Sequence, residues 1–159
     1  MDTRAQGVAR STRPIALRQL DLLDGLKTLS YAGNMLAGRL AKERGFDEAL
    51  LVTPHGRVLE APTSSLFWVD PDGAIWTPPL SEHILASITR SRVMELAEVG
   101  ERPCTMDDLR EAREAFLAST TREAQSIAAI EELELPDGER TREVAAALRR
   151  RIQEELAAG

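Results

Sequence analysis

The sequence predicts an α+β fold in which helices flank a mixed, largely antiparallel sheet. Two observations support this prediction. Short apolar runs are separated by Thr53-Pro54-His55-Gly56 and Asp70-Pro71-Asp72-Gly73, which both place proline second and glycine fourth, as is typical of β-turns. Apolar residues also recur at helical spacing in residues 31–44, 87–99 and 141–156. Together these patterns predict hairpins packed against helices.

The elements can be justified in chain order. Gly45 and Gly100 follow apolar helical repeats and are expected to end the first two helices. Thr105-Met106-Asp107-Asp108 resembles a capping box that opens a short helix. Trp68 and Trp76 fall in consecutive strands and are expected to pack in the core or at an interface. The expected strands are 48–53, 57–61, 66–69, 74–77, 115–119 and 127–130, and the first four are expected to form one antiparallel meander.

Length and composition narrow the class of protein. A chain of 159 residues is expected to form a single domain, residues 1–159. Its net charge of -6 gives nucleic-acid binding no electrostatic support. Cys104 is the single cysteine, so no disulfide can form within the chain. Because no apolar run has membrane-spanning length and the N-terminus lacks a signal-peptide core, we expect a cytoplasmic protein with no membrane partner.

Lys27 is the residue with the most distinctive setting for chemistry. Of the 20 lysines and arginines, only Lys27 and Lys42 are lysine, and Lys42 lies in a solvated helix end. Lys27 stands between Leu26 and Leu29, where burial is expected to lower the pKa of its amine. A desolvated lysine can lose its proton and attack carbonyls, which arginine cannot do.

Three other groups of residues each allow two interpretations. Glu60 is a strand-end carboxylate in solvent, which the pattern favours, or a partly buried carboxylate that awaits a cation. Residues 87–90 open a helix whose N-terminus could bind phosphate, or Ser87 is simply an N-cap. Residues 119–121 offer three hydroxyls that could hold an anion or form an ordinary loop. His55 and His83 share no ligand spacing with Cys104, so no metal site is expected.

Taken together, the ordered segments resemble the larger domain of the class IV aminotransferases, the pyridoxal-phosphate enzymes of fold type IV. This family includes branched-chain aminotransferases, D-amino-acid aminotransferases and aminodeoxychorismate lyase. The resemblance covers nearly the whole chain. Its segments are Leu26-Lys27-Thr28-Leu29-Ser30-Tyr31, Gly45-Phe46-Asp47-Glu48-Ala49-Leu50, Gly56-Arg57-Val58-Leu59-Glu60, Ser65-Leu66-Phe67-Trp68, Thr77-Pro78, Ile84-Leu85-Ala86-Ser87-Ile88-Thr89-Arg90 and Glu114-Ala115-Phe116-Leu117-Ala118-Ser119-Thr120.

The resemblance implies a role for each matching residue. Lys27 matches the catalytic lysine that forms the internal aldimine with pyridoxal 5'-phosphate. Tyr31 matches a tyrosine near the phenolic oxygen of the cofactor, and Glu60 matches the carboxylate that pairs with the pyridine nitrogen. The matching phosphate ligands are Ile88, Thr89 and Thr120.

The implied function is amino-group transfer between an amino acid, with the branched-chain type favoured, and 2-oxoglutarate, in a homodimer of the family type. One alternative is aminodeoxychorismate lyase, which eliminates pyruvate in the synthesis of 4-aminobenzoate. Another is a catalytically inactive, truncated fragment. Family members carry a smaller N-terminal domain ahead of the lysine. The resemblance implies that this domain is absent here and that residues 1–20 are the remnant of the interdomain connection. At Ser65 many relatives have asparagine.

Overall fold

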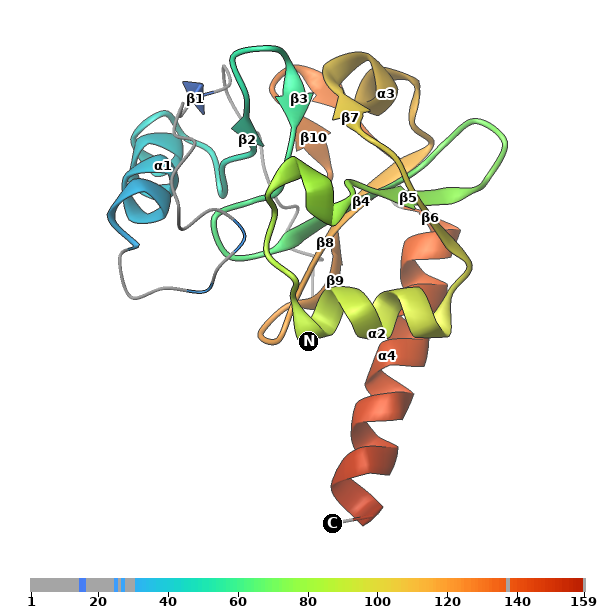
Figure 1. Ribbon diagram of the computed structural model, residues 1–159. Helices are drawn as coiled ribbons and strands as arrows, with labels where there is room; N and C mark the ends of the chain where they lie inside the picture. Colours follow the sequence, from blue (N-terminus) through green and yellow to red (C-terminus); the bar gives the residue numbers. More distant parts are fainter. Residues whose placement is uncertain (1–14, 17–24, 26, 28–30, 137, 159) are drawn as a thin grey trace.

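The computed structural model describes residues 15–16, 25, 27, 31–136 and 138–158 (Figure 1). The helices are α1 (Ala32–Glu43), α2 (Ile88–Leu96), α3 (Met106–Glu111) and α4 (Glu139–Ala158), with a 3-10 helix at Leu80–Glu82. The strands are β1 (Ile15–Ala16), β2 (Leu51–Val52), β3 (Arg57–Val58), β4 (Ser65–Val69), β5 (Ile75–Thr77), β6 (Val99–Glu101), β7 (Cys104–Thr105), β8 (Glu114–Ser119), β9 (Glu123–Ser126), β10 (Ala129–Ile130) and β11 (Leu133–Glu134). The α+β class is confirmed.

A five-stranded sheet with the order β6-β5-β4-β8-β9 lies at the centre of the fold. Its middle strands, β4 and β8, pair antiparallel from Ser65 opposite Ala118 to Val69 opposite Glu114. Strands β5 and β6 pair in parallel, which makes the sheet mixed. A second sheet has the order β1-β2-β3-β7, and β10 pairs with β11.

Two apolar clusters pack on opposite faces of the central sheet. Alternate residues of a strand point to opposite faces, so β4 and β8 each contribute to both clusters. On one face, Phe67 and Phe116 stack with ring centroids 4.9 Å apart, beneath α2 and α4. On the other face, Leu66 and Leu117 belong to a cluster that includes residues of β2, β3, β7 and α3. Both middle strands are therefore buried on both sides.

A carboxylate from the central sheet caps the N-terminus of α4. The Glu114 carboxylate accepts hydrogen bonds from the backbone N–H groups of Arg140 (3.2 Å) and Thr141 (2.8 Å). The Thr141 hydroxyl donates to it as well, at 2.9 Å. Val144 and Leu148 then bury the first half of α4, whereas its second half is mostly exposed and extends beyond the body of the fold (Figure 1).

Several sequence predictions about the elements are confirmed. The predicted first, second and last helices correspond to α1, α2 and α4, although α2 is shorter than expected. The capping box is present, because the Thr105 side chain accepts from the Asp108 N–H while the Asp108 carboxylate accepts from the Thr105 N–H. Both predicted turns close with hydrogen bonds of 3.0 Å, from Gly56 to Thr53 and from Gly73 to Asp70.

The predicted single meander is wrong. The hairpin β2–β3 belongs to the second sheet, and the hairpin β4–β5 belongs to the central sheet. Local turn chemistry fixes each hairpin but does not determine which sheet it joins. Residues 99–101 also form strand β6 rather than the end of a helix, since the Trp76 ring packs directly over Gly100 and β6 pairs with β5.

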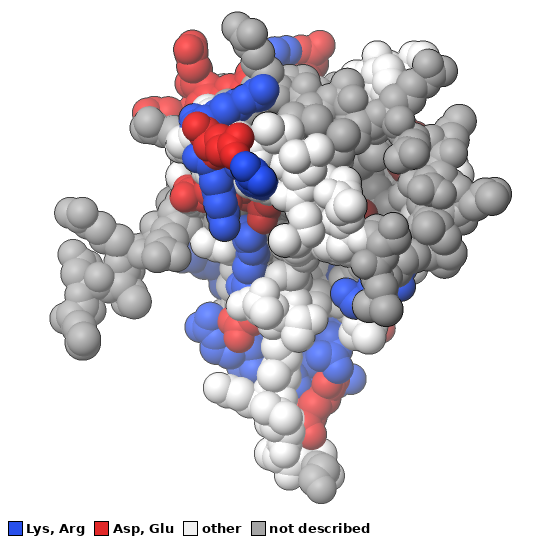
Figure 2. Space-filling model, turned by 90° about the vertical axis from the view of Figure 1, so that its left-hand side faces the viewer, with Lys and Arg blue, Asp and Glu red and all other residues white. Residues whose placement is uncertain are grey.

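Surface charge on the face that includes α1 is mixed. Figure 2 shows acidic and basic side chains interleaved beside uncharged surface, in the part of this face that described residues form. Met35 and Leu36 of α1 are 68% and 49% exposed.

Within the described parts of the chain, no helix combines the length and apolar character needed to cross a membrane.

Candidate active site

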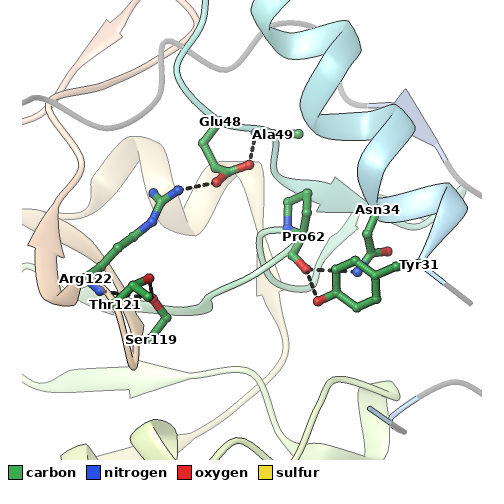
Figure 3. A network of polar contacts seen from close by, with 8 residues as sticks. All are labelled: Tyr31, Asn34, Glu48, Ala49, Pro62, Ser119, Thr121 and Arg122. Atoms are coloured by element: carbon green, nitrogen blue, oxygen red, sulfur yellow. Dashed lines mark hydrogen bonds and ion pairs between the residues drawn. The ribbon is translucent and has the colours of Figure 1, made fainter. Parts of the chain in front are cut away.

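The connection between β3 and β4 is tied to the start of α1. The Tyr31 hydroxyl donates a hydrogen bond to the Pro62 carbonyl oxygen at 2.7 Å. The Asn34 side-chain amide donates to the same oxygen at 2.9 Å, so the N-cap residue of α1 and a residue of its first turn converge on one backbone group (Figure 3). Pro62 lies two residues after Glu60. The structure therefore connects Tyr31 to the connection that carries Glu60.

Glu60 is tied in turn to the loop that leads into α2. Its Oε1 accepts a hydrogen bond from the Leu85 N–H at 3.1 Å. Burial raises the pKa of the Glu60 carboxyl from 4.5 to about 7, although the Leu85 N–H and the Arg90 charge act in the opposite direction. Of the two interpretations of Glu60, the partly buried carboxylate is confirmed and the solvent-exposed one, which the sequence pattern favoured, is wrong.

Gly25 connects the lysine segment to the same loop. Its φ of 77° lies in the left-handed region, and a Cβ at this position would lie 3.3 Å from the Ile84 carbonyl oxygen. Glycine is suited to this position because it tolerates both the backbone conformation and the close approach. Lys27 follows Gly25 by two positions in the chain.

The expected burial of Lys27 is wrong, because its side chain is exposed. Apolar sequence neighbours bury a side chain only where other elements pack over it, and no described element covers Lys27. Leu26 and Leu29, on which that expectation rested, lie outside the described residues.

The N-terminus of α2 begins at this loop and is capped. The Ser87 Oγ accepts a hydrogen bond from the Arg90 N–H at 3.3 Å, so Ser87 is an N-cap residue. Thr89 is buried, whereas the Ile88 side chain is 74% exposed. The buried Arg90 guanidinium donates to the Pro78 carbonyl oxygen at 2.9 Å and pairs with Glu101, which fixes the first turn of α2 against the edge of the sheet.

The hydroxyl cluster lies at the same end of the central sheet. Ser65, the first residue of β4, pairs with Ala118, so Ser119 at the end of β8 and the turn that follows it lie beside the connection that carries Glu60. Ser119 Oγ and Thr121 Oγ1 lie 3.4 Å apart, and Thr120 is exposed. These residues form the turn between β8 and β9, and both interpretations of the cluster stay open.

These groups fit the chemistry of pyridoxal phosphate. An exposed primary amine, a half-buried carboxylate, a helix N-terminus and exposed hydroxyls suit an aldehyde, a ring nitrogen and a phosphate, respectively. The hydroxyls of Ser64 and Ser65 are buried beside the Glu60 connection, and neither has a hydrogen-bond partner among the described residues. Buried hydroxyls without partners are uncommon, so these two are consistent with a polar group bound nearby.

Some residues around the site were missed from the sequence. Asn34 and Arg90 looked like ordinary helix residues, and the ion pair between Glu48 and Arg122 joins positions 74 residues apart. An arginine three residues after the N-cap serine Ser87 is the sequence signal that could have singled out Arg90. Within the described part of the chain, no group of three or more His, Cys, Asp or Glu residues could hold a metal ion.

Comparison with known proteins gives the family. Residues 5–130 match the amino-transferase class IV family. A protein of Methanocaldococcus jannaschii assigned as a branched-chain-amino-acid aminotransferase is 36% identical over 123 residues, which cover 74% of this chain and 42% of that protein. The D-alanine aminotransferase of Listeria monocytogenes is 34% identical over 120 residues, covering 72% and 41%. The chain belongs to the class IV aminotransferase family.

Solved structures agree with this conclusion. The branched-chain amino acid aminotransferase of Thermobaculum terrenum in its PLP-bound holo form is similar with a TM-score of 0.78 and 34% identity, covering 82% of this chain and 46% of that one. The fold type IV architecture expected from the resemblance is thus confirmed. The chain spans less than half the length of these relatives.

Proposed function

We propose that this chain forms the cofactor-binding part of a pyridoxal-phosphate-dependent aminotransferase. The observation that best supports this proposal is a set of three contacts: Tyr31 with Pro62, Glu60 with Leu85, and Gly25 with Ile84. The family and the PLP-bound relative support the same cofactor.

The proposed roles follow from the chemistry of each side chain. Lys27 Nζ provides the primary amine that would hold the cofactor at its aldehyde carbon, with loss of water, and that would carry the α-proton of the substrate. Thr89, Thr120 and the N–H groups at the start of α2 bind the phosphate. When bound, pyridoxal phosphate supplies a ring that withdraws electrons from the substrate α-carbon.

Glu60 is the residue proposed to orient the ring and hold its nitrogen protonated. Its carboxyl is partly desolvated, which raises its pKa to about 7. A cationic ring N–H beside it would favour the ionised carboxylate, because an opposite charge stabilises the charged form. Glu60 would then be the ionised partner that keeps the proton on the ring nitrogen.

The proposed substrates are branched-chain amino acids with 2-oxoglutarate as the acceptor. The M. jannaschii and T. terrenum relatives favour the branched-chain type. Another relative is a D-alanine aminotransferase, so the test compares L- and D-amino acids as substrates. These relatives are aminotransferases, so we propose transamination rather than elimination. The homodimer stays a prediction.

The test is a half-reaction followed by absorption. The chain is loaded with pyridoxal phosphate and mixed separately with L-valine, L-leucine, L-glutamate and D-alanine, and the visible band of the bound cofactor is recorded. We expect the branched-chain L-amino acids and L-glutamate to remove the band, and 2-oxoglutarate to restore it. Lys27→Ala should abolish the response, while the control Lys42→Ala, which changes the exposed lysine of α1, should retain it. A loaded chain whose band responds to none of these amino acids would contradict the proposal.

A further inference from the structure

The turn between β8 and β9 presents exposed hydroxyls at its tip. Ser119 pairs with Glu123 across the hairpin, which leaves Thr120, Thr121 and Arg122 as the turn. Inside it, the Arg122 N–H donates to Ser119 Oγ at 3.3 Å. Thr120 and Thr121 are both exposed. The position of these hydroxyls therefore depends on how the whole turn is held.

An ion pair ties one side of the turn to the connection between α1 and β2. The Arg122 guanidinium reaches Glu48 Oε2 at 2.5 Å, and the two side chains are 25% and 8% exposed. The other carboxylate oxygen of Glu48 accepts the Ala49 N–H at 3.1 Å. Figure 3 shows the Arg122 side chain extending from the turn toward Glu48. Both oxygens of this nearly buried carboxylate are thus used, which leaves Arg122 little freedom.

A second ion pair ties the other side of the turn to α4. The Arg149 guanidinium donates to Glu123 Oε2 from Nε at 3.0 Å and from Nη2 at 2.7 Å. These side chains are 61% and 29% exposed, so solvent screens this pair more than the pair of Arg122 and Glu48. The less exposed pair is the stronger restraint on the turn.

A nearly buried ion pair adds little net stability, because desolvation offsets much of the attraction. Its geometry, however, is specific, since the guanidinium offers a rigid fork of donors. The pair of Arg122 and Glu48 joins the turn to a segment 74 residues away in the chain. Its main consequence is therefore a fixed position for the turn.

We propose that Glu48 and Arg122 are positioning residues that hold the turn at residues 120–122 in place to bind the phosphate of the cofactor. This inference rests on the proposed function. It assigns the two residues an indirect role, because they act through the turn and its Thr120 hydroxyl and need not contact the cofactor.

The test compares the affinities of the chain for pyridoxal 5'-phosphate and for pyridoxal, which lacks the phosphate. Glu48→Met keeps the length of the side chain and removes the acceptor, and Glu48→Gln is the conservative second variant if the first does not fold. We expect Glu48→Met to weaken binding of pyridoxal phosphate by about tenfold and to change binding of pyridoxal by less than about twofold. Glu43→Gln, on the exposed face of α1, is the control and should change neither.

Glu48→Met also separates positioning from simple electrostatics. Removal of a negative charge near a phosphate site would by itself tighten phosphate binding. Weaker binding therefore supports positioning, whereas tighter or unchanged binding of pyridoxal phosphate, or an equal loss for both compounds, would overturn it. If the unsubstituted chain binds neither compound, the proposed function itself fails, an outcome that is distinct from these.

Discussion

The Glu60 carboxylate is the group in the site whose chemistry the fold changes most clearly. Its pKa rises from 4.5 to about 7 because the connection between β3 and β4 holds it partly away from water, and one backbone N–H from Leu85 compensates incompletely. Such a group is a poor isolated anion and a good partner for a cation. The raised pKa is thus a property of the folded chain that agrees with the role proposed for Glu60.

This shift should make stability depend on pH in a defined direction. Between pH 4.5 and about 7 the folded chain holds the Glu60 proton while the unfolded chain has lost it. The folded state then binds more protons, so the contribution of Glu60 to the free energy of unfolding falls as pH rises through this window. Glu60→Gln should match the unsubstituted chain at low pH and be more stable above the window, by on the order of 3 kcal/mol.

Urea unfolding at a series of pH values measures this difference directly. Glu95→Gln, at an exposed position of α2, provides the matched control and should show no such dependence. Equal pH dependence for the unsubstituted chain and Glu60→Gln would show that Glu60 is not desolvated as the structure describes.

Among the helices, α4 depends on a cap that comes from the central sheet. Gly138 precedes this helix, and a Cβ added there would lie 1.7 Å from Glu114 Oε2. Glu114 in turn satisfies the first N–H groups of α4. A side chain at position 138 would push the carboxylate away from the helix it caps.

Gly138→Ala should therefore lower the free energy of unfolding by about 2 kcal/mol, the usual range for overpacking. Gly33→Ala is the matched control, because Gly33 lies in α1 with nothing within 4 Å of the added Cβ. That change should raise stability by up to about 1 kcal/mol, since alanine is the better helix former. Denaturant unfolding of both variants checks the prediction, and equal effects of the same sign would contradict it.

The elements that could be predicted from the sequence are those with local signals. Thr105 and Asp108 predict the capping box, and Gly56 and Gly73 predict the two turns. Each of these signals depends only on residues within a few positions. Strands β6 and β9 have no such signal. The packing of the Trp76 ring over Gly100 is long-range, and the β8–β9 hairpin turns at residues 120–122 without the proline or glycine that marks the two predicted turns.

The site shows the same division. The identities of Lys27, Tyr31 and Glu60 could be proposed from the family resemblance. The half-burial of Glu60 and the Glu48–Arg122 pair could not, because each depends on segments that are distant in sequence. The exposure of Lys27 could not be predicted for the same reason, as burial depends on what packs over a residue.

In the molecule as a whole, two cores on either face of the central sheet hold the site segments in place. The strands that lead to the site, β4 and β8, contribute to both cores. The ends of these two strands are therefore held by packing on both faces of the sheet. The site lies at one end of this doubly packed pair. A rigid sheet that presents loop residues at its end is a common way to position binding groups.

The most direct test of the cofactor site is to locate the point of attachment. The unsubstituted chain is mixed with pyridoxal phosphate, reduced with borohydride, digested and mapped by mass spectrometry. The chain has only two lysines, so Lys42 serves as the internal control. We expect the reduced adduct on the peptide that contains Lys27, with Lys42 unmodified. An adduct distributed equally between the two lysines, or none on Lys27, would contradict a cofactor site built around Lys27 and Glu60.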